Sequence, residues 1–349
     1  EGGLPNTIPL REDVLFHDGT RFDAEAMAFS LRRFLEIGTL SYVVGDRITA
    51  VEAPEPYQLR LRLSRPSSSL DNLLTATNLT PVSPRAYRDH QDRFLNDHFV
   101  GTGPYRLASF RAVQQRLEPF TQYWGPAPSN AGLDLIYLSN STALFGAMRS
   151  GEVDVLLSDA IDEDQRLALN RMAGAGQLRE GQGPALVIGY ITLLSNRPPL
   201  QNPVLRQALA LSLDRDLINR RVSHGLRPPL LSLVPPGLPG GDIGPWPRHD
   251  AARARNLFIQ AGYCNGKVFT LPFTYRSNVP ADRLMALTWQ AQIQRDLSDC
   301  LSLKLDGVES TTVYRQLGEG AFQAVMLDWR GAYPDPEAYL APLLSCRES

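Results

Sequence analysis

The sequence predicts an α/β protein with two or three lobes. Its 349 residues, of which 43% are hydrophobic and 21% charged, exceed one typical domain and can bury a large core. An α+β pattern opens the chain, and beyond the glycine-rich stretch 174–183 long strands alternate with well-capped helices. We therefore expect an α+β subdomain over residues 1–97, inserted in a first lobe whose main part is 98–184, and a second α/β lobe over 185–349.

The first segment opens with a strand, a turn and a helix. Residues 16–19 (FHDG) are a tight-turn signal, and Asp23 can cap a helix whose apolar residues fall on one face. Residues 57–63 then alternate between apolar and polar side chains, which is the period of a half-buried strand. The apolar positions of the helix are Met27, Leu31, Phe34 and Leu35.

Four strands and one helix are expected in the second segment. A glycine-rich turn at 100–104 feeds the first of these strands. Leu144 and Met148 share a face of the helix, which leads through Ser150 and Gly151 into the last strand. The strands are expected at 105–107, 115–119, 133–138 and 153–157.

Capping and helix-ending residues mark the helices of the third segment. Asn202 is an N-cap, and Pro203 is the first residue of the helix that follows it. Asp250 begins a second helix, which Gly262 can end. Residues 227–247 between them are rich in proline and glycine, so they form neither a helix nor the interior of a sheet.

The cysteines leave two alternatives open. Cys264 and Cys300 each follow a helix and precede a strand, so a right-handed βαβ crossover would bring them to the same end of neighbouring parallel strands. A disulfide fits this arrangement, and so do two buried free thiols. No cysteine has a His or Cys neighbour at metal-ligand spacing, so we expect no metal site; Cys346 is left over.

Charge and hydropathy exclude several classes of partner. The formal net charge is -2 with scattered basic residues, which excludes the electrostatic footprint of a nucleic-acid-binding protein. No run of 18 apolar residues exists, so no membrane span is expected. The first residues lack the pattern of a signal peptide, so an export signal was either removed or never present.

Residues 329–340 (WRGAYPDPEAYL) contain three aromatic residues and two carboxylates in and around a Tyr-Pro-Asp-Pro turn. The apolar run 322–327 before them predicts a strand, which Pro334 and Pro336 prevent from continuing in a sheet interior. The aromatic residues should therefore lie at a strand end, where open α/β sheets bind ligands.

No catalytic motif is present. The sequence has no nucleophile elbow, no HExxH zinc motif and no phosphate-binding loop. None of the five histidines belongs to a motif, and His17 in the turn 16–19 is expected to be structural. We expect no enzyme and no cofactor.

Five segments of the chain resemble the landmarks of one family and occur in the same order as in that family. The family is the peptide and nickel type of extracytoplasmic solute-binding proteins, which serve ABC importers. The segments are residues 14–26 (VLFHDGTRFDAEA), 100–107 (VGTGPYRL), 148–154 (MRSGEVD), 202–216 (NPVLRQALALSLDRD) and 329–340. The resemblance implies a periplasmic-binding-protein-like bilobed clamp that closes on a peptide or another small organic solute and delivers it to a membrane permease. It also implies a monomer that performs no chemistry and works in the periplasm or elsewhere outside the cytoplasm, either free or anchored to the membrane by a segment that this chain does not cover.

The resemblance assigns candidate ligand-binding residues. In peptide-binding members an aspartate directly before the tyrosine of the fifth segment pairs with the amino group of the ligand, and this sequence has Ala332 there. Asp328 or Asp335 could replace it, with Asp328 and Arg330 on one side of the strand as a pair for a zwitterion or as a solvated salt bridge. Asp335 also fits a cap of its own turn. The aromatic and polar candidates are Trp329, Tyr333, Tyr190, Ser158 and Tyr42.

Two further expectations follow from the resemblance. Family members usually carry additional chain before the first segment and after the fifth, so this chain is expected to be a fragment or a trimmed form with an incomplete first lobe. The same fold also resembles the sensor half of some cytoplasmic transcription regulators, which is the alternative function. A disulfide would favour the exported protein, because disulfides are rare in the cytosol.

Overall fold

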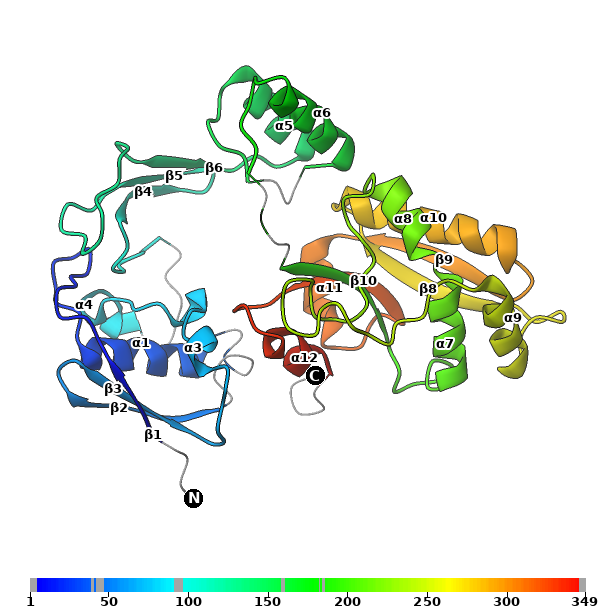
Figure 1. The fold of residues 1–349 in the computed structure, drawn as a ribbon, viewed down its shortest axis with the longest axis horizontal. Helices are drawn as coiled ribbons and strands as arrows, with labels where there is room; N and C mark the ends of the chain where they lie inside the picture. The colour runs from blue at the N-terminus through cyan, green and yellow to red at the C-terminus, as the bar shows by residue number, and fades with distance from the viewer. Residues whose placement is uncertain are drawn as a thin grey trace. The chain divides into compact units, whose positions relative to one another are not determined.

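The chain forms two compact units. This computed structural model describes residues 5–38, 41, 47–90, 97–157, 161–181, 183 and 186–344. Unit 1 comprises residues 1–138 with 331–349, and unit 2 comprises residues 139–330, so the chain passes between them after 138 and again after 330 (Figure 1). The sequence analysis placed boundaries after 97 and 184 instead, and that division into three segments stays a prediction.

An antiparallel sheet and a long helix begin unit 1. The helix α1 (Ala24–Ile37) starts as predicted, because the Asp23 carboxylate accepts a hydrogen bond from the backbone N–H of Ala26 at 2.8 Å. It packs against a sheet of order β1-β3-β2, in which Leu59, Leu61 and Leu63 of the central strand are buried. The sheet consists of β1 (Pro5–Pro9), β2 (Ile48–Glu55) and β3 (Gln58–Leu63), and the short elements that follow are α3 (Leu70–Leu73), η1 (Thr77–Leu79), α4 (Pro84–Tyr87) and η2 (Arg88–His90).

The C-terminal helix α12 (Glu337–Leu344) belongs to unit 1 through specific polar contacts. Nη1 of Arg47 donates to a carboxylate oxygen of Glu337 at 2.9 Å, and the Ser69 hydroxyl donates to the same oxygen. Nδ2 of Asn72 donates to Oδ2 of Asp335 at 3.2 Å. These contacts attach the last helix to the region that surrounds α3.

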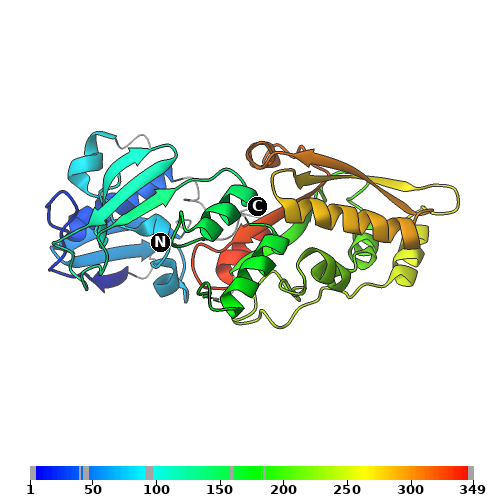
Figure 2. The same cartoon turned by 90° about the horizontal axis from the view of Figure 1, so that it is seen from above.

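A mainly parallel four-stranded sheet forms the body of unit 2. The strand order is β7-β10-β8-β9, with β7 antiparallel to β10 and the other pairs parallel. Helix α10 lies along β8 and β9 (Figure 2). The strands are β7 (Val187–Leu193), β8 (Phe269–Arg276), β9 (Leu301–Val308) and β10 (Ala324–Arg330), and the helices are α5 (Ser141–Ser150), α6 (Glu163–Gly174), α7 (Pro203–Ser212), α8 (Arg215–Val222), α9 (Ala251–Gln260), α10 (Pro280–Asp296) and α11 (Ser310–Leu317).

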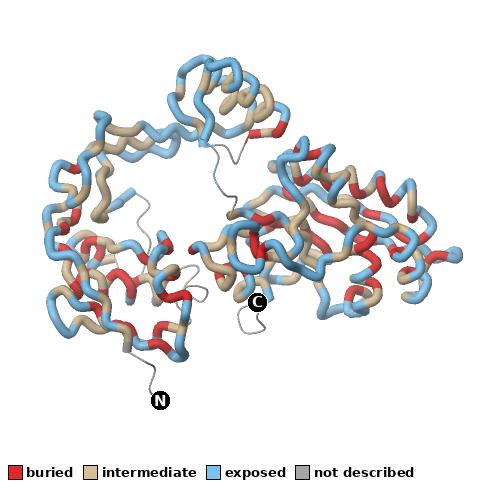
Figure 3. The backbone as a smooth tube through the Cα atoms, viewed as in Figure 1, coloured by how far each residue is buried: buried red, intermediate tan, exposed pale blue. Residues whose placement is uncertain are grey.

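The residues of a second sheet of unit 1 are intermediate or exposed in burial (Figure 3), and several of the exposed ones are apolar. Its order is β4-β5-β6, and cross-strand pairs Leu107–Leu117 and Leu117–Leu133 place these residues on one face. On the same face Leu135 is 47% exposed, whereas the other face carries an Arg116–Asp134 ion pair. The strands are β4 (Tyr105–Arg111), β5 (Gln114–Pro119) and β6 (Leu133–Ile136).

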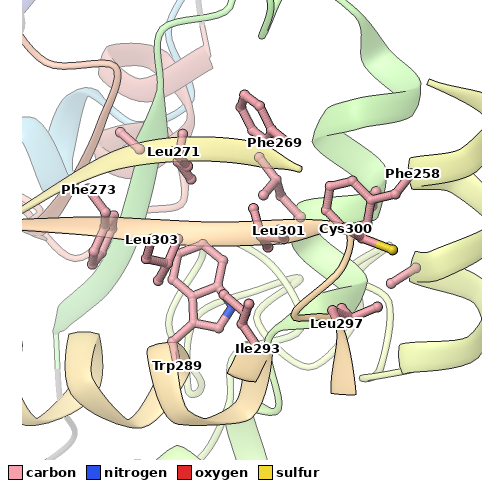
Figure 4. Packing of buried hydrophobic residues seen from close by; sticks show 14 of the residues in the cluster. Phe258, Phe269, Leu271, Phe273, Trp289, Ile293, Leu297, Cys300, Leu301 and Leu303 are labelled. Atoms are coloured by element: carbon pink, nitrogen blue, oxygen red, sulfur yellow. The ribbon is translucent and has the colours of Figure 1, made fainter. Parts of the chain in front are cut away.

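The core of unit 2 is built around aromatic residues between the sheet and its helices (Figure 4). Trp289 of α10 meets Phe273 of β8 edge to face, with ring centroids 5.3 Å apart. Its indole Nε1 donates to the hydroxyl of Ser212 at 3.1 Å, which pairs a polar group that would otherwise be buried alone.

Cys264 and Cys300 form a disulfide in the structure, with their Cα atoms 4.1 Å apart. Both residues are buried, and they lie just before the adjacent parallel strands β8 and β9. Of the two alternatives that the sequence leaves open, the structure contains the bridge. Cys346 lies outside the described residues.

One predicted strand is wrong. Residues 153–157 form no strand, and the side chains of Val155 and Leu157 are 74% and 87% exposed. The run is apolar enough for a strand, but strand formation also needs a hydrogen-bonded neighbour and a surface to pack against.

Candidate functional site

Charged residues gather where the parallel strands of unit 2 end. Strand β8 ends at Arg276, and Asp328 lies near the end of β10. Tyr314 comes from α11, which follows β9, and Asp282 comes from the first turn of α10, which follows β8. We call Arg276, Asp282, Tyr314 and Asp328 the Arg276 cluster. It occupies the edge at which open α/β sheets bind ligands.

The guanidinium of Arg276 is buried, and each of its three nitrogens donates at least one hydrogen bond within the cluster. Its Nε and Nη2 donate to the two carboxylate oxygens of Asp282, at 2.7 and 3.1 Å. Its Nη1 donates to Oδ1 of Asp328 at 2.7 Å and to the Tyr314 hydroxyl at 2.9 Å. The planar fork of arginine therefore joins two carboxylates, which is an arrangement that a lysine could not reproduce.

Asp328 is the solvent-facing member of the cluster. Its side chain is 43% exposed, compared with 6% for Arg276. Oδ1 of Asp328 accepts from Arg276 and also from the Tyr314 hydroxyl, at 2.9 Å. The described part of the chain provides no hydrogen bond to Oδ2 of Asp328, so one carboxylate oxygen remains available.

Burial and neighbouring charges shift the pKa values of the cluster and of Tyr190 beside it. Burial alone would lower the pKa of Arg276, but the hydrogen bonds and charge of Asp282 and the charge of Asp328 outweigh it, so the guanidinium pKa lies above its ordinary value. Burial raises the pKa of Asp282, although both of its oxygens accept from Arg276, which is the geometry of a carboxylate. Burial, followed by the charge of Asp328, raises the pKa of Tyr190 to about 12.

Local hydrogen bonds fix the loops that carry the cluster. The N–H of Ser277 donates to the carbonyl of Val308 at 2.8 Å, which extends the pairing of β8 and β9 beyond Arg276. Oδ1 of Asn278 accepts from the N–H of Ser310 at 3.0 Å, at the start of α11. Glu309 caps that helix by accepting from the N–H of Thr311 at 2.8 Å.

Four of the residues predicted from the sequence lie in unit 2. Trp329 and Arg330 complete β10, with Trp329 half-buried and Arg330 exposed. Asp328 makes its ion pair with Arg276, rather than the pair with Arg330 that the sequence suggested. Tyr190 of β7 lies opposite Leu327 and packs against the cluster of Val313, Val325 and Leu327.

Two other predicted residues lie in unit 1. Tyr333 is buried, and Asp335 caps its own turn by accepting from the N–H of Glu337 at 2.9 Å. The second oxygen of Asp335 accepts from Asn72, so both oxygens are engaged within unit 1. Tyr42 and Ser158 lie outside the described residues. A ligand-binding role stays a prediction for all eight residues.

The sequence analysis missed Arg276, Asp282 and Tyr314. Arg276 ends an alternating apolar strand, and an arginine at that position is a detectable signal because strand ends in open sheets face ligands. Its pairing with Asp282, six residues later, and with Tyr314 depends on how two helices return to the sheet, which no local pattern encodes.

The described residues contain neither a metal-binding group of side chains nor a membrane-spanning helix. No group of three or more His, Cys, Asp or Glu side chains there could hold a metal ion. Within the same residues, every helix is too short or too polar to cross a lipid bilayer.

Comparison with known protein families identifies the chain. The model of the bacterial extracellular solute-binding proteins, family 5 Middle, matches residues 1–349. The chain belongs to this family. The resemblance that the five sequence segments carry is therefore confirmed, and the family is one of solute-binding proteins rather than of enzymes.

Relatives of this family 5 protein include a curated protein of similar sequence. The glutathione-binding protein GsiB of Escherichia coli O1:K1 / APEC is 26% identical over 299 residues, which cover 84% of this chain. The match covers 57% of GsiB, so the chain spans little more than half the length of the curated relatives it matches.

Solved structures confirm the predicted fold. The murein tripeptide binding protein MppA of Escherichia coli matches with a TM-score of 0.82 at 19% identity, over 100% of this chain and 72% of MppA. NikA from Brucella suis, in complex with Fe(III)-EDTA, matches with a TM-score of 0.79 at 22% identity, over 99% of this chain and 72% of NikA. The α/β fold of this family 5 protein is thus that of the periplasmic binding proteins.

Proposed function

We propose that this chain is the solute-capturing part of an ABC importer's substrate-binding component. It would take up an oligopeptide-like or other small organic solute and deliver it to a membrane permease. The observation that carries the proposal is the match of one family of extracellular solute-binding proteins to residues 1–349. The position of the Arg276 cluster at the ligand-binding edge of an α/β sheet supports it.

Four of the candidate ligand-binding residues belong to unit 2, on β10 and on the neighbouring strand β7. In this proposal Asp328, Trp329, Arg330 and Tyr190 would contribute ligand contacts from unit 2.

The names of related proteins support a small organic ligand. GsiB is a glutathione-binding protein, and DppA from Helicobacter pylori was solved in complex with the peptide STSA, with a TM-score of 0.81 and 21% identity to this chain. AgaA, with a TM-score of 0.78 and 21% identity, was solved with agropinic acid. These ligands share amino-acid-like organic chemistry, which we propose for this chain as well.

The proposed location is the periplasm or another extracytoplasmic site. The disulfide between Cys264 and Cys300 supports an oxidising compartment, because cytosolic proteins rarely keep such bonds. For the same reason it disfavours the alternative of a cytoplasmic regulator's sensor domain.

Native mass spectrometry of the full-length protein, purified from the cells that make it, tests the proposal. A small organic molecule should co-purify, be released intact on denaturation and rebind in isothermal titration calorimetry. Incubation of the ligand with the protein for hours should leave the ligand chemically unchanged. Formation of a product would overturn the proposal, and so would failure of the full-length protein to bind any peptide, opine or glutathione offered to it.

A further inference from the structure

Helices α5 and α6 have little buried core of their own. All residues of both helices are described, and the buried ones are Ala147 of α5 and Glu163 of α6. A polar contact joins the N-terminal ends of the two helices, where the N–H of Asp162 donates to the Ser141 hydroxyl at 2.9 Å. Few buried apolar side chains are typical of the segments of a protein that open at low free-energy cost. The position of this helix pair therefore depends strongly on its polar contacts with the rest of unit 2.

Two polar contacts join α6 to the turn that follows α8. Nη2 of Arg227 lies 2.5 Å from Oε1 of Glu163, and Nε2 of His224 donates to Oδ1 of Asp164 at 3.0 Å. Asn219 of α8 fixes the turn, because its side-chain oxygen accepts from the N–H of Arg227 at 2.9 Å. We call the pairs Glu163–Arg227 and Asp164–His224 the α6–α8 contact.

Glu163 is buried without well-formed hydrogen bonds. Its side chain is 6% exposed, and among the described residues neither of its carboxylate oxygens has a partner in hydrogen-bond geometry. Arg166 is its second cationic neighbour, with Nε 3.4 Å from Oε2. The Arg276–Asp282 pair of the same unit is also buried, yet both of its carboxylate oxygens accept hydrogen bonds. A buried ion pair needs such bonds to offset the loss of hydration, so the Glu163–Arg227 pair contributes little net stability.

Attachment and release of α6 are therefore close in free energy. In the attached arrangement Glu163 has two guanidinium neighbours and lies in the first turn of α6, where a helix N-terminus favours a carboxylate. In a released arrangement the carboxylate of Glu163 and the guanidinium of Arg227 would regain full hydration, which favours charged groups. Two arrangements of similar free energy are the requirement for a conformational switch.

We infer that the α6–α8 contact is a releasable latch, which holds the helix pair α5–α6 on α8 in one conformation of unit 2 and frees it in another. A ligand or partner that favours one of these conformations would shift the balance between them. The inference goes beyond the proposed function, because it concerns a movement within unit 2 and holds with or without a solute.

Hydrogen–deuterium exchange of the full-length protein, measured by mass spectrometry, tests the latch. Arg227→Ala leaves the buried Glu163 without its nearest cation, and the backbone amides of α6 should exchange about 10- to 100-fold faster. Arg227→Lys keeps a positive charge and should retain most of the protection. In the wild-type protein a higher salt concentration should accelerate exchange of α6, because Arg227 is 50% exposed and its ion pair is open to screening.

Arg221→Ala is the matched control, since Arg221 is an exposed arginine in the last turn of α8. It should leave the exchange of α6 unchanged, and the strands β8 and β9 should exchange equally in all of these proteins. Unchanged exchange of α6 in Arg227→Ala would overturn the inference. Faster exchange over the whole of unit 2 would do the same, because it indicates general destabilisation. If Arg227→Ala does not fold, the salt series of the wild-type protein decides, and exchange of α6 that is independent of salt overturns the inference.

Discussion

Gly331 lies directly against the ring of Tyr339, where a Cβ on Gly331 would come within 2.7 Å of a ring carbon. Tyr339 is completely buried, so its ring has no open space into which it could move. Gly331 is also the first residue after the chain passes from unit 2 back into unit 1. The close approach explains why glycine follows β10 at this point.

Gly331→Ala is therefore expected to destabilise the protein. Overpacking a buried contact costs about 1–3 kcal/mol in the free energy of unfolding. Urea unfolding followed by fluorescence measures the change. Gly146→Ala is the control, because Gly146 lies inside α5 with no heavy atom near its added methyl group, and alanine there should be neutral or stabilising by up to about 1 kcal/mol. Equal stability of the two variants would contradict the packing argument.

Asp282→Ala should destabilise unit 2 by more than an exposed pair would. The substitution removes both acceptors of Nε and Nη2 of the buried Arg276 and leaves Asp328 as its remaining carboxylate. Loss of one partner from a buried ion pair costs about 3–5 kcal/mol, and here the remaining Asp328 should reduce that cost.

The same helix provides the control for Asp282. Asp296 pairs with Arg295 at the end of α10, and the Arg295 side chain is 59% exposed. Asp296→Ala should change the free energy of unfolding by less than about 1 kcal/mol, as is usual for exposed ion pairs. Thermal unfolding of both variants makes the comparison, and similar losses would show that the Arg276 cluster adds no special stability.

Local chemistry explains which parts of the fold were predictable. Asp23, Asn202 and Asp250 each accept a backbone hydrogen bond at a helix start, as the sequence predicted, because a cap depends on residues only two or three positions apart. The strand expected directly before the turn 16–19 is only an isolated bridge between Leu15 and Arg21, and the first strand, β1, lies earlier, at Pro5–Pro9. The sequence signal of β1 is weak because the strand begins and ends with proline, which an edge strand tolerates.

The candidate site was predictable only in part. Asp328 and Trp329 were found because they lie at the end of one apolar strand, which is a feature of a single segment. Arg276 is 52 residues from Asp328, and their contact depends on the β7-β10-β8-β9 order of the sheet. That order results from packing of the whole unit and cannot be read from any one segment.

Removal of the disulfide should lower stability without changing the fold. Cys264 and Cys300 are 36 residues apart, and a bridge closing a loop of this size stabilises a protein by about 2–4 kcal/mol, chiefly by restricting the unfolded chain. The double substitution Cys264→Ala and Cys300→Ala should lower the unfolding temperature and leave the circular dichroism spectrum of the native state unchanged. An unaltered unfolding temperature would show that the bridge contributes little.

The ionisation of Tyr190 offers a spectroscopic measure of the field at Asp328. Burial, then the charge of Asp328, raises the pKa of Tyr190 to about 12 from an ordinary value of 10.0. Because the folded state disfavours the phenolate, Tyr190 contributes stability that is complete below pH 10 and is lost as the pH rises toward 12. Absorbance at a wavelength specific for phenolate should therefore show a late-titrating tyrosine that is missing in Tyr190→Phe.

Asp328→Asn should move that late titration to lower pH. The substitution removes the charge of Asp328, which together with that of Tyr314 raises the pKa of Tyr190, and it leaves the burial of Tyr190 in place. The shift should be partial, since burial is the larger cause. Asp306, an exposed aspartate of β9, provides the control, and Asp306→Asn should leave the titration unchanged because Asp306 is not among the causes that shift the pKa of Tyr190. A Tyr190 titration that is the same in Asp328→Asn and in the wild type would contradict the contribution of the Asp328 charge to the pKa of Tyr190.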